Sequence, residues 1–293
     1  MGIREEFKKL KNHIHMLTNC ELPKDLMDQN LELNSMDIIL FHLCEEYDWY
    51  KEYYKNLIKN NPNRITILDN SAYEFFIKGQ TLDQEKYCEL INELAPTYYI
   101  LPDTLMDAND TISKTREFIV KYLKNIKVRS IPMGVLQGNS SVDFIFCKQA
   151  YEEYFGIKHI AIPFHNSFFK DVKIDSIVYN TFKKFLNDKP IFKSEDVKYA
   201  MGRAQWIINN AHILKRCKYV HVLGSHCPLE KMFYDSFVNS MDTGYPVKCG
   251  VCGYKLFDEP SKPDIIIDEF FEAPLDSNTK NIIKDNVIKF CRL

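Results

Sequence analysis

The stretch R-I-T-I-L-D-N-S-A-Y-E-F-F, residues 64–76, decides which fold the rest of the chain is expected to adopt. Its β-branched run at residues 65–68 predicts a short buried strand, and that strand ends at the carboxylate of Asp69. In α/β sheets and barrels, ligands bind at the carboxyl ends of the strands. Asp69 is therefore the first candidate functional residue, although an aspartate in this position is also a common helix cap.

The same succession of strand, polar strand end and helix recurs along the chain. Eight such β/α units predict an α/β fold of the (β/α)8 TIM-barrel type, whereas an open doubly wound sheet would account for fewer of them. We expect a barrel domain at residues 36–293, with an N-terminal helical extension at residues 1–35 and a long insertion after the fifth strand. The strands are expected at residues 36–43, 65–68, 98–101, 131–136, 159–162, 219–223, 237–241 and 264–267.

The composition limits the classes of protein that remain. A chain of 293 residues with 45% hydrophobic content can bury one large core. Lys and Arg total 38 against 40 Asp and Glu, so any nucleic-acid contact is expected to be local rather than spread over the surface. No signal peptide, myristoylation motif or membrane-spanning run is apparent. The absence of these segments predicts a cytoplasmic protein without membrane contact. The nine cysteines are odd in number and lie mostly in apolar runs, which indicates reduced thiols.

The polar strand ends form one candidate site. In a barrel they converge on a single mouth, where carboxylates and an amide ringed by glycines and aromatics suit a planar, hydrogen-bonding ligand. The sequence has no glycine-rich phosphate loop, no H-E-x-x-H and no G-x-S-x-G, which disfavours P-loop and redox chemistry. Taken singly, each of these positions is also compatible with an ordinary turn. The candidates are Asp69, Asp103, Gln137 with Gly138, Leu223 with Gly224, and Asp242.

Five segments in this order resemble the queuine/archaeosine tRNA-guanine transglycosylase superfamily: D-N-S-A-Y, L-P-D-T, M-G-V-L-Q-G, H-V-L-G-S and S-M-D-T. On successive barrel strands, that family carries an aspartate-small-small-small-aromatic segment, a second aspartate, G-I-V-Q-G, a glycine turn and F-D-S or F-D-C. The resemblance covers residues 65–247, most of the expected barrel. The shared order of the five segments makes it more specific than any one of them.

The resemblance implies a role for each of these residues. Asp242 would be the nucleophile that attacks C1′ of a guanosine and expels guanine, leaving a covalent glycosyl-enzyme. Asp69 would give a proton to the departing base or take one from the incoming base. Asp103 and Gln137 would read the edges of the purine, and Tyr73 would stack on its face. No cofactor is required by this chemistry. The remaining base-binding residues implied are Asn70, Gly138, Leu223 and Gly224.

The chain departs from the tRNA-acting members at several places. Their arginine-bearing P-T-R segment after the nucleophile is replaced by T-G-Y-P-V at residues 243–247, and their glycine pair after the fifth strand by Pro163-Phe164. These losses resemble the DNA-acting branch, the enzymes of phages and bacterial modification systems that exchange guanine in DNA for a 7-deazaguanine. That likeness implies DNA and a preQ0-like 7-deazaguanine base as partners, in the host cytoplasm if a phage encodes the protein, with tRNA as the alternative nucleic acid.

A DNA-acting enzyme of this kind must flip its target base or take it single-stranded, and would hold the backbone with local charge. The insertion after the expected fifth strand offers several lysines near the predicted mouth. An ordinary solvated surface explains the same lysines equally simply. The backbone candidates are Lys183, Lys184, Lys189, Lys193 and Arg203.

The family's zinc site is only half present. Cys249 and Cys252 flank a glycine, and a metal would need two more ligands, for which Cys291, His226 and Cys227 are available. Zinc and a plain turn with two free thiols both stay open. The oligomeric state also stays open. A catalytically silent barrel that binds nucleic acid or a partner subunit is the alternative to both transglycosylase hypotheses.

Overall fold

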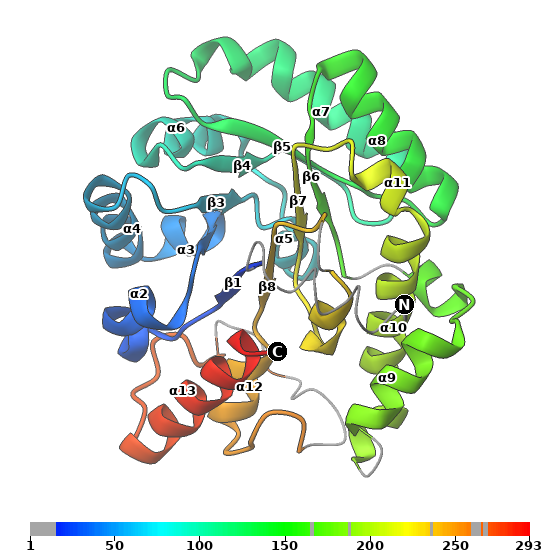
Figure 1. Cartoon of the computed structure of the whole chain (residues 1–293). Helices are drawn as coiled ribbons and strands as arrows, with labels where there is room; N and C mark the ends of the chain where they lie inside the picture. The colour runs from blue at the N-terminus through cyan, green and yellow to red at the C-terminus, as the bar shows by residue number, and fades with distance from the viewer. Residues whose placement is uncertain (1–15, 165–166, 187–188, 235–236, 259–264, 266–268) are drawn as a thin grey trace. The chain divides into compact units, whose positions relative to one another are not determined.

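The computed structural model describes residues 16–164, 167–186, 189–234, 237–258, 265 and 269–293 (Figure 1). Its eight strands are parallel neighbours in the order β1-β8-β7-β6-β5-β4-β3-β2 and alternate with helices along the chain. This is the (β/α)8 TIM-barrel class that the sequence predicts. None of the described helices combines the length and the apolar composition needed to cross a membrane.

The chain divides into two compact units. We call Met36–Asn166 the continuous unit, and Met1–Ser35 together with Ser167–Leu293 the composite unit. Each unit is described by itself below.

The continuous unit contains five strands, each paired in parallel with the next. Most of its longer helices begin at a capping side chain; Asp83, for example, accepts the backbone N–H groups of Glu85 and Lys86. Figure 1 shows the helices following the strands in turn. The strands are β2 (Asp37–Leu40), β3 (Thr66–Asp69), β4 (Tyr98–Ile100), β5 (Ile131–Val135) and β6 (His159–Ile162). The helices are α3 (Phe41–Glu46), α4 (Asp48–Asn60), α5 (Ala72–Lys78), α6 (Gln84–Leu94), α7 (Ala108–Tyr122), η2 (Leu123–Asn125) and α8 (Ser141–Phe155).

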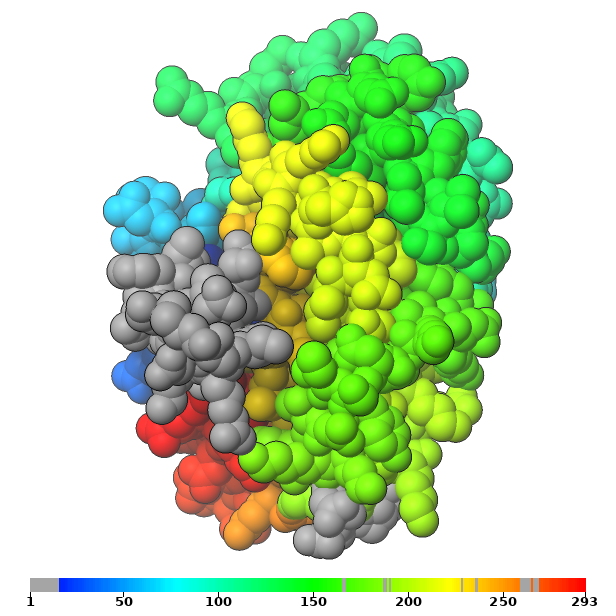
Figure 2. All heavy atoms as spheres, turned by 45° about the vertical axis from the view of Figure 1, so that its right-hand side comes forward, coloured from blue at the N-terminus to red at the C-terminus, as the bar shows by residue number. Residues whose placement is uncertain are grey.

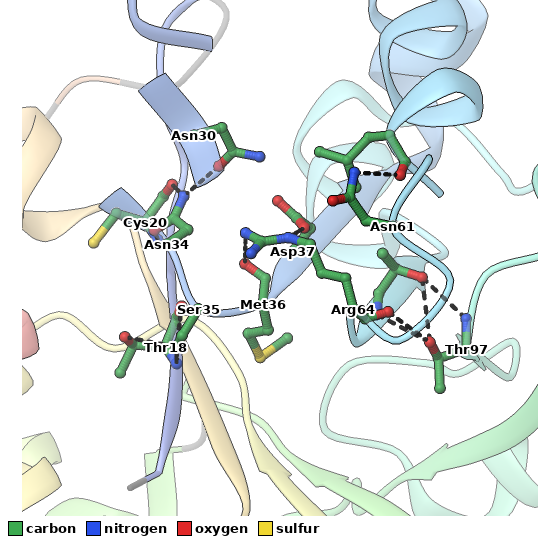
Figure 3. Close-up of polar contacts among 12 residues, drawn as sticks. Thr18, Cys20, Asn30, Asn34, Ser35, Met36, Asp37, Asn61, Arg64 and Thr97 are labelled. Carbon is green, nitrogen blue, oxygen red and sulfur yellow. Dashed lines mark hydrogen bonds and ion pairs between the residues drawn. The ribbon is translucent and has the colours of Figure 1, made fainter. Parts of the chain in front are cut away.

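Two close contacts hold strands β2 and β5 of this sheet. The carboxylate of Asp37, fully buried at the start of β2, is paired with Arg64, whose guanidinium also reaches the Met36 carbonyl oxygen (Figure 3). On β5, a Cβ at Gly134 would lie 2.5 Å from the ring of Tyr151. Only glycine at this position lets α8 pack this closely on the strand, and Tyr151 then donates its hydroxyl to the Val135 carbonyl oxygen at 3.1 Å.

The composite unit contains three parallel strands in the order β1-β8-β7. Its longest described helices begin at Ser194 and Asp276, whose side chains accept backbone N–H groups of the first turn. The strands are β1 (Leu17–Cys20), β7 (Tyr219–Val222) and β8 (Ser240–Thr243). The helices are η1 (Lys24–Gln29), α2 (Asn30–Leu33), η3 (Ser167–Asp171), α9 (Ser176–Leu186), η4 (Pro190–Lys193), α10 (Glu195–Asn209), α11 (Ala211–Leu214), η5 (Pro228–Phe233), α12 (Tyr245–Val251) and α13 (Ser277–Cys291).

Strand β1 corrects the expectation of a purely helical N-terminal extension. Leu17–Cys20 pairs in parallel with β8, so part of residues 1–35 belongs to the sheet. Asn34 fixes its end, because the amide accepts the Cys20 N–H at 2.7 Å and donates to the Cys20 carbonyl oxygen at 2.9 Å (Figure 3). The strand escaped prediction because L-T-N-C is short and half polar.

Some of the other predicted elements lie at shifted positions, and some lie outside the described residues. The strand predicted at residues 237–241 lies slightly later, at Ser240–Thr243, and the predicted insertion contains η3, α9 and η4. The strand predicted at residues 264–267 lies outside the described residues except for residue 265, and so do residues 1–15 of the expected N-terminal extension. With β1 at the start, the described strands number eight without the one predicted at residues 264–267.

A tyrosine of α6 holds the ends of two strands in the continuous unit. The Tyr87 hydroxyl lies 3.0 Å from the Leu68 carbonyl oxygen in β3 and 2.7 Å from that of Ile100 in β4. Its single proton is shared between the two acceptors. Tyr99, also fully buried, has a hydroxyl with no hydrogen-bond partner in the described part of the chain. The two tyrosines are therefore a matched pair with opposite hydrogen-bonding states.

We expect Tyr87→Phe to lower the free energy of unfolding by about 1–3 kcal/mol, because it leaves buried carbonyl oxygens without their donor. Tyr99→Phe should be neutral or stabilising, because it removes a buried hydroxyl that has no such partner. Urea unfolding of both variants and the wild type measures the difference. Equal losses in the two variants would contradict the assignment of Tyr87 as the tie between β3 and β4.

Candidate functional site

The candidate residues form two clusters, one in each unit. The amide-carboxylate cluster of the continuous unit contains Asn70, Asp103 and Gln137, which are joined by hydrogen bonds. The cluster of the composite unit contains His221, Gly224, Ser240 and Asp242, which are likewise joined. We call it the nucleophile cluster, after the role predicted for Asp242. The geometry below is given within each unit.

Asp103 lies at the centre of the amide-carboxylate cluster. Asn70 donates its Nδ2–H to Asp103 Oδ1 at 2.8 Å, and Gln137 donates its Nε2–H to Asp103 Oδ2 at 2.7 Å. All three side chains are buried. The expectation that the ends of neighbouring strands bring Asp103 and Gln137 together is thus confirmed as geometry.

The backbone fixes the orientation of both amides. Asn70 Oδ1 accepts the Ala72 N–H at 2.9 Å, and Gln137 Oε1 accepts the Met106 N–H at 3.0 Å. Each amide must therefore turn its NH2 group toward Asp103. A carboxylate oxygen can accept about two hydrogen bonds, so each oxygen of Asp103 keeps room for one more donor. The cluster can accept a ligand that presents two adjacent N–H groups.

Burial raises the pKa of Asp103 above its ordinary value. The hydrogen bonds from Asn70 and Gln137 favour the charged form and offset only part of that shift. Asp103 is therefore a carboxyl group that takes up a proton more readily in the folded chain than in the unfolded one.

Asp69 is the last residue of β3 and the first residue of the D-N-S turn. Its Oδ1 accepts the Ser71 N–H at 2.6 Å, so the carboxylate closes a turn ahead of α5, whose N-cap residue is Ser71 rather than Asp69. Ser71 adopts a left-handed conformation with φ 59° and hydrogen-bonds His42, with Oγ 2.9 Å from Nδ1. A bulky side chain is disfavoured in this conformation, which accounts for the small residue. Asp69 stays partly exposed, and the ring of Tyr73 is 39% exposed on α5.

Gly138 is required by close packing. Its φ is 140°, and a Cβ there would lie 2.1 Å from the Cβ of Asp143 in α8. The backbone after β5 thus passes directly over the start of α8. Gly224 in the composite unit also has a positive φ, 56°, but nothing lies near the place of its missing Cβ.

In the nucleophile cluster, one oxygen of Asp242 receives two donors. Oδ1 accepts the Gly224 N–H at 3.0 Å and lies 2.9 Å from His221 Nε2. His221 Nδ1 lies 2.7 Å from Ser240 Oγ. No hydrogen bond reaches Oδ2 from the residues that the structure describes. Asp242 is buried, so its carboxylate is held by one oxygen and presents the other.

His221 and Asn19 are site residues that the sequence did not single out. His221 stands in the H-V-L-G-S segment, and the alternation along β7 puts it on the same face as Leu223. Asn19 is opposite Asp242 in the register of β1 and β8 and is buried. The alternation was a usable signal for His221, whereas Asn19 lies on the strand that was missed.

Arg203 is a correction, because it is not available to a nucleic-acid backbone. Its side chain is fully buried in α10, and Nε donates to Glu230 Oε2 at 2.9 Å. Nη1 donates to the Leu223 carbonyl oxygen at 2.6 Å, and Glu230 also accepts the Ser225 hydroxyl. The ion pair therefore holds the turn at Leu223–Ser225, next to Asp242. Gly202 lets α10 come this close to η3, since a Cβ there would lie 1.8 Å from the Phe169 carbonyl oxygen.

The four candidate lysines lie in or near helices of the insertion. Lys183 and Lys184 are in the last turn of α9 and are exposed, as is Lys193 at the end of η4. Lys189 forms an ion pair with Asp258. Figure 2 shows the surface of this part of the composite unit in light green. A role in backbone binding stays a prediction.

The candidate zinc ligands do not gather in the described residues. Cys249 is buried in α12, and Cys252 follows that helix. His226 pairs instead with Asp196 at 3.0 Å, and the Cys291 thiol lies 3.5 Å from the Leu33 carbonyl oxygen. Among the residues described, no group of three or more His, Cys, Asp or Glu is arranged to hold a metal ion.

No model of a known protein family matches this chain, and no curated protein matches it. The fold and the two clusters define a (β/α)8 barrel that carries buried carboxylates at the ends of its strands. What it does must be inferred from the chemistry of those carboxylates.

The raised pKa of Asp103 gives stability a pH dependence of known sign. Because the folded pKa lies above the ordinary value of about 3.9, Asp103 contributes stability at low pH that is lost as the pH rises through the raised pKa. We expect the free energy of unfolding of the wild type, measured with urea, to rise relative to that of Asp103→Asn as the pH falls from the raised pKa toward the ordinary value.

Asp175→Asn is the control of opposite sign. The Val178 and Ile177 N–H groups and Gln205 lower the pKa of Asp175, so its contribution is lost as the pH falls. The wild type should therefore lose its advantage over Asp175→Asn in acid. A difference between wild type and Asp103→Asn that does not change with pH would show that Asp103 is not perturbed.

Proposed function

We propose that this protein is a base-exchange transglycosylase that replaces guanine in DNA with a 7-deazaguanine through a covalent aspartyl-glycosyl intermediate. The observation that carries the proposal is the asymmetric anchoring of Asp242. Its Oδ1 accepts two hydrogen bonds while Oδ2 receives none from the described residues. A carboxylate presented in this way is suited to attack a sugar carbon, and the order of the sequence motifs supports the same reaction.

The amide-carboxylate cluster supports guanine as the base. The Watson–Crick edge of guanine presents N1–H and N2–H side by side, which fit the two oxygens of Asp103. Asn70 and Gln137 hold that carboxylate in place from the other side. A 7-deazaguanine has the same Watson–Crick edge, so one pocket serves both the departing and the incoming base.

The reaction consists of two displacements. In the first, Asp242 Oδ2 attacks C1′, the C1′–N9 bond breaks, and guanine leaves with the electron pair and gains a proton from Asp69. In the second, Asp69 takes the N9 proton of the incoming base, N9 attacks C1′, and Asp242 leaves as a carboxylate. The exchange needs no cofactor, because one glycosidic bond replaces another.

The segment after Asp242 supports DNA rather than tRNA. Tyr245–Val251 forms α12, with Pro246 in its first turn and Tyr245 buried. It is thus a packed helix without the arginine that the tRNA-acting enzymes carry after their nucleophile. Exchange into tRNA by the same chemistry, and a catalytically silent barrel, are the alternatives.

The test is the covalent intermediate. Wild-type protein incubated with guanine-containing DNA should form an adduct that survives denaturation, and Asp242→Asn should form none. Asp69→Asn should slow base exchange by about 10²–10⁴-fold, the usual contribution of a general acid or base. Asp276→Asn is the matched control, since that exposed aspartate caps α13 and asparagine caps equally well.

Other outcomes decide between the alternatives. The proposal is wrong if the wild type forms no adduct with single- or double-stranded DNA, or if Asp242→Asn forms it unchanged. Labelled guanine that enters tRNA and not DNA would favour the tRNA enzyme. Nucleic-acid binding that survives both substitutions, with no exchange in the wild type, would indicate a silent barrel.

A further inference from the structure

His221 is fully buried in β7 between two side chains of the neighbouring strand β8. Its Nδ1 lies 2.7 Å from Ser240 Oγ and its Nε2 lies 2.9 Å from Asp242 Oδ1. Both ring nitrogens are therefore engaged, one with a hydroxyl and one with the carboxylate of the nucleophile cluster.

These contacts fix which nitrogen carries the proton. An ionised Asp242 can only accept, so Nε2 must be the donor toward it. Nδ1 then accepts the Ser240 hydroxyl proton in the neutral ring, because the hydroxyl can rotate to donate. Ser240 thereby holds His221 in the tautomer that donates to Asp242.

The plainer explanation is a core histidine whose hydrogen bonds are merely satisfied. That explanation does not account for the acceptor that His221 shares with the backbone N–H of Gly224. Here Asp242 Oδ1 receives both His221 Nε2–H and the Gly224 N–H, while Oδ2 receives none from the described residues. Two donors are concentrated on one oxygen of the carboxylate that is proposed to react.

We propose that His221 is a positioning residue that stabilises Asp242 as the leaving carboxylate of the second displacement. This inference rests on the proposed transglycosylase function. In the covalent intermediate, Asp242 is a neutral ester, with Oδ2 bonded to C1′ and Oδ1 as its carbonyl oxygen. When N9 of the incoming base attacks C1′, the C1′–Oδ2 bond breaks and its electron pair goes to the carboxylate.

The two donors act on the charge that appears in this step. A hydrogen bond to a carboxylate oxygen is about twice as strong as one to a neutral carbonyl, so both bonds strengthen as the ester breaks. The donors are already in place in a buried site, where little reorganisation is needed. The first displacement runs the other way, since Asp242 gives up its charge. Loss of His221 should therefore slow breakdown of the intermediate and spare its formation.

The experiment measures formation and decay of the adduct separately. Protein is mixed with guanine-containing DNA to form the adduct, and a 7-deazaguanine base is then added to discharge it. For His221→Phe we expect decay to slow by about 10²–10³-fold, as for loss of one oxyanion donor, with formation within about tenfold of the wild type. The adduct should then accumulate.

Two further variants separate positioning from general damage. His221→Gln keeps an N–H donor and should recover part of the decay rate. Asn286→Ala removes a buried amide of the same unit that donates to the Pro246 carbonyl oxygen and does not contact Asp242. It should destabilise the protein without slowing decay more than formation. Urea unfolding checks that each variant is folded.

The outcomes distinguish this inference from the proposed function. If the wild type forms no adduct, the proposed function fails and this inference with it. If the wild type forms the adduct and His221→Phe discharges it at the wild-type rate, only the role of His221 is wrong. Formation and decay slowed equally would make His221 a structural residue and would also overturn the inference.

Discussion

The ends of the strands depend on side chains that reach them from the helices. A strand's last carbonyl groups point beyond the ladder, and buried carbonyls need a donor. In the continuous unit, Tyr87 supplies one for β3 and β4, and Tyr151 supplies one for β5. In the composite unit, Arg203 does so for Leu223, after β7. Asn70, Asp103 and Gln137 each follow a strand end that is tied in this way, which fixes the point from which their loops start.

Burial determines which hydrogen bonds the carboxylates in those loops need. A carboxylate taken out of water needs donors, and the donors that it receives limit its remaining chemistry. Arg203 and Glu230 illustrate one outcome, since a buried ion pair that is fully engaged can only hold structure. Asp103 illustrates another, since neutral amides hold it without cancelling the effect of burial on its pKa. The number of donors that each buried carboxylate receives thus separates one that only holds structure, Glu230, from one whose oxygens keep room for further donors, Asp103.

The sequence was sufficient wherever the information was local. The alternation of apolar strand, polar end and amphipathic helix predicted the barrel class, and it predicted that Asp103 and Gln137 meet, because neighbouring strands end together. It was insufficient where a long-range contact decides. Strand β1 is recognisable only from its pairing with β8, and the burial of Arg203 depends on Glu230, far along the chain. His221 needed the register of β7 and β8 to show that its ring reaches Asp242.

The distribution of donors distinguishes the two buried aspartates more sharply than their burial does. Asp103 has one side-chain donor on each oxygen, a symmetrical arrangement that leaves a matched pair of acceptors for a ligand. Asp242 has both donors on one oxygen, an asymmetrical arrangement that leaves the other for attack. In the proposed function, the symmetrical carboxylate recognises the base, because it offers two equal contacts at a fixed spacing. In the proposed reaction, Asp242 forms its bond through the oxygen without donors, while the two donors on the other oxygen stabilise the charge that the carboxylate regains. On this basis the roles proposed for Asp103 and Asp242 could not be exchanged, even though both are aspartates buried in the same fold.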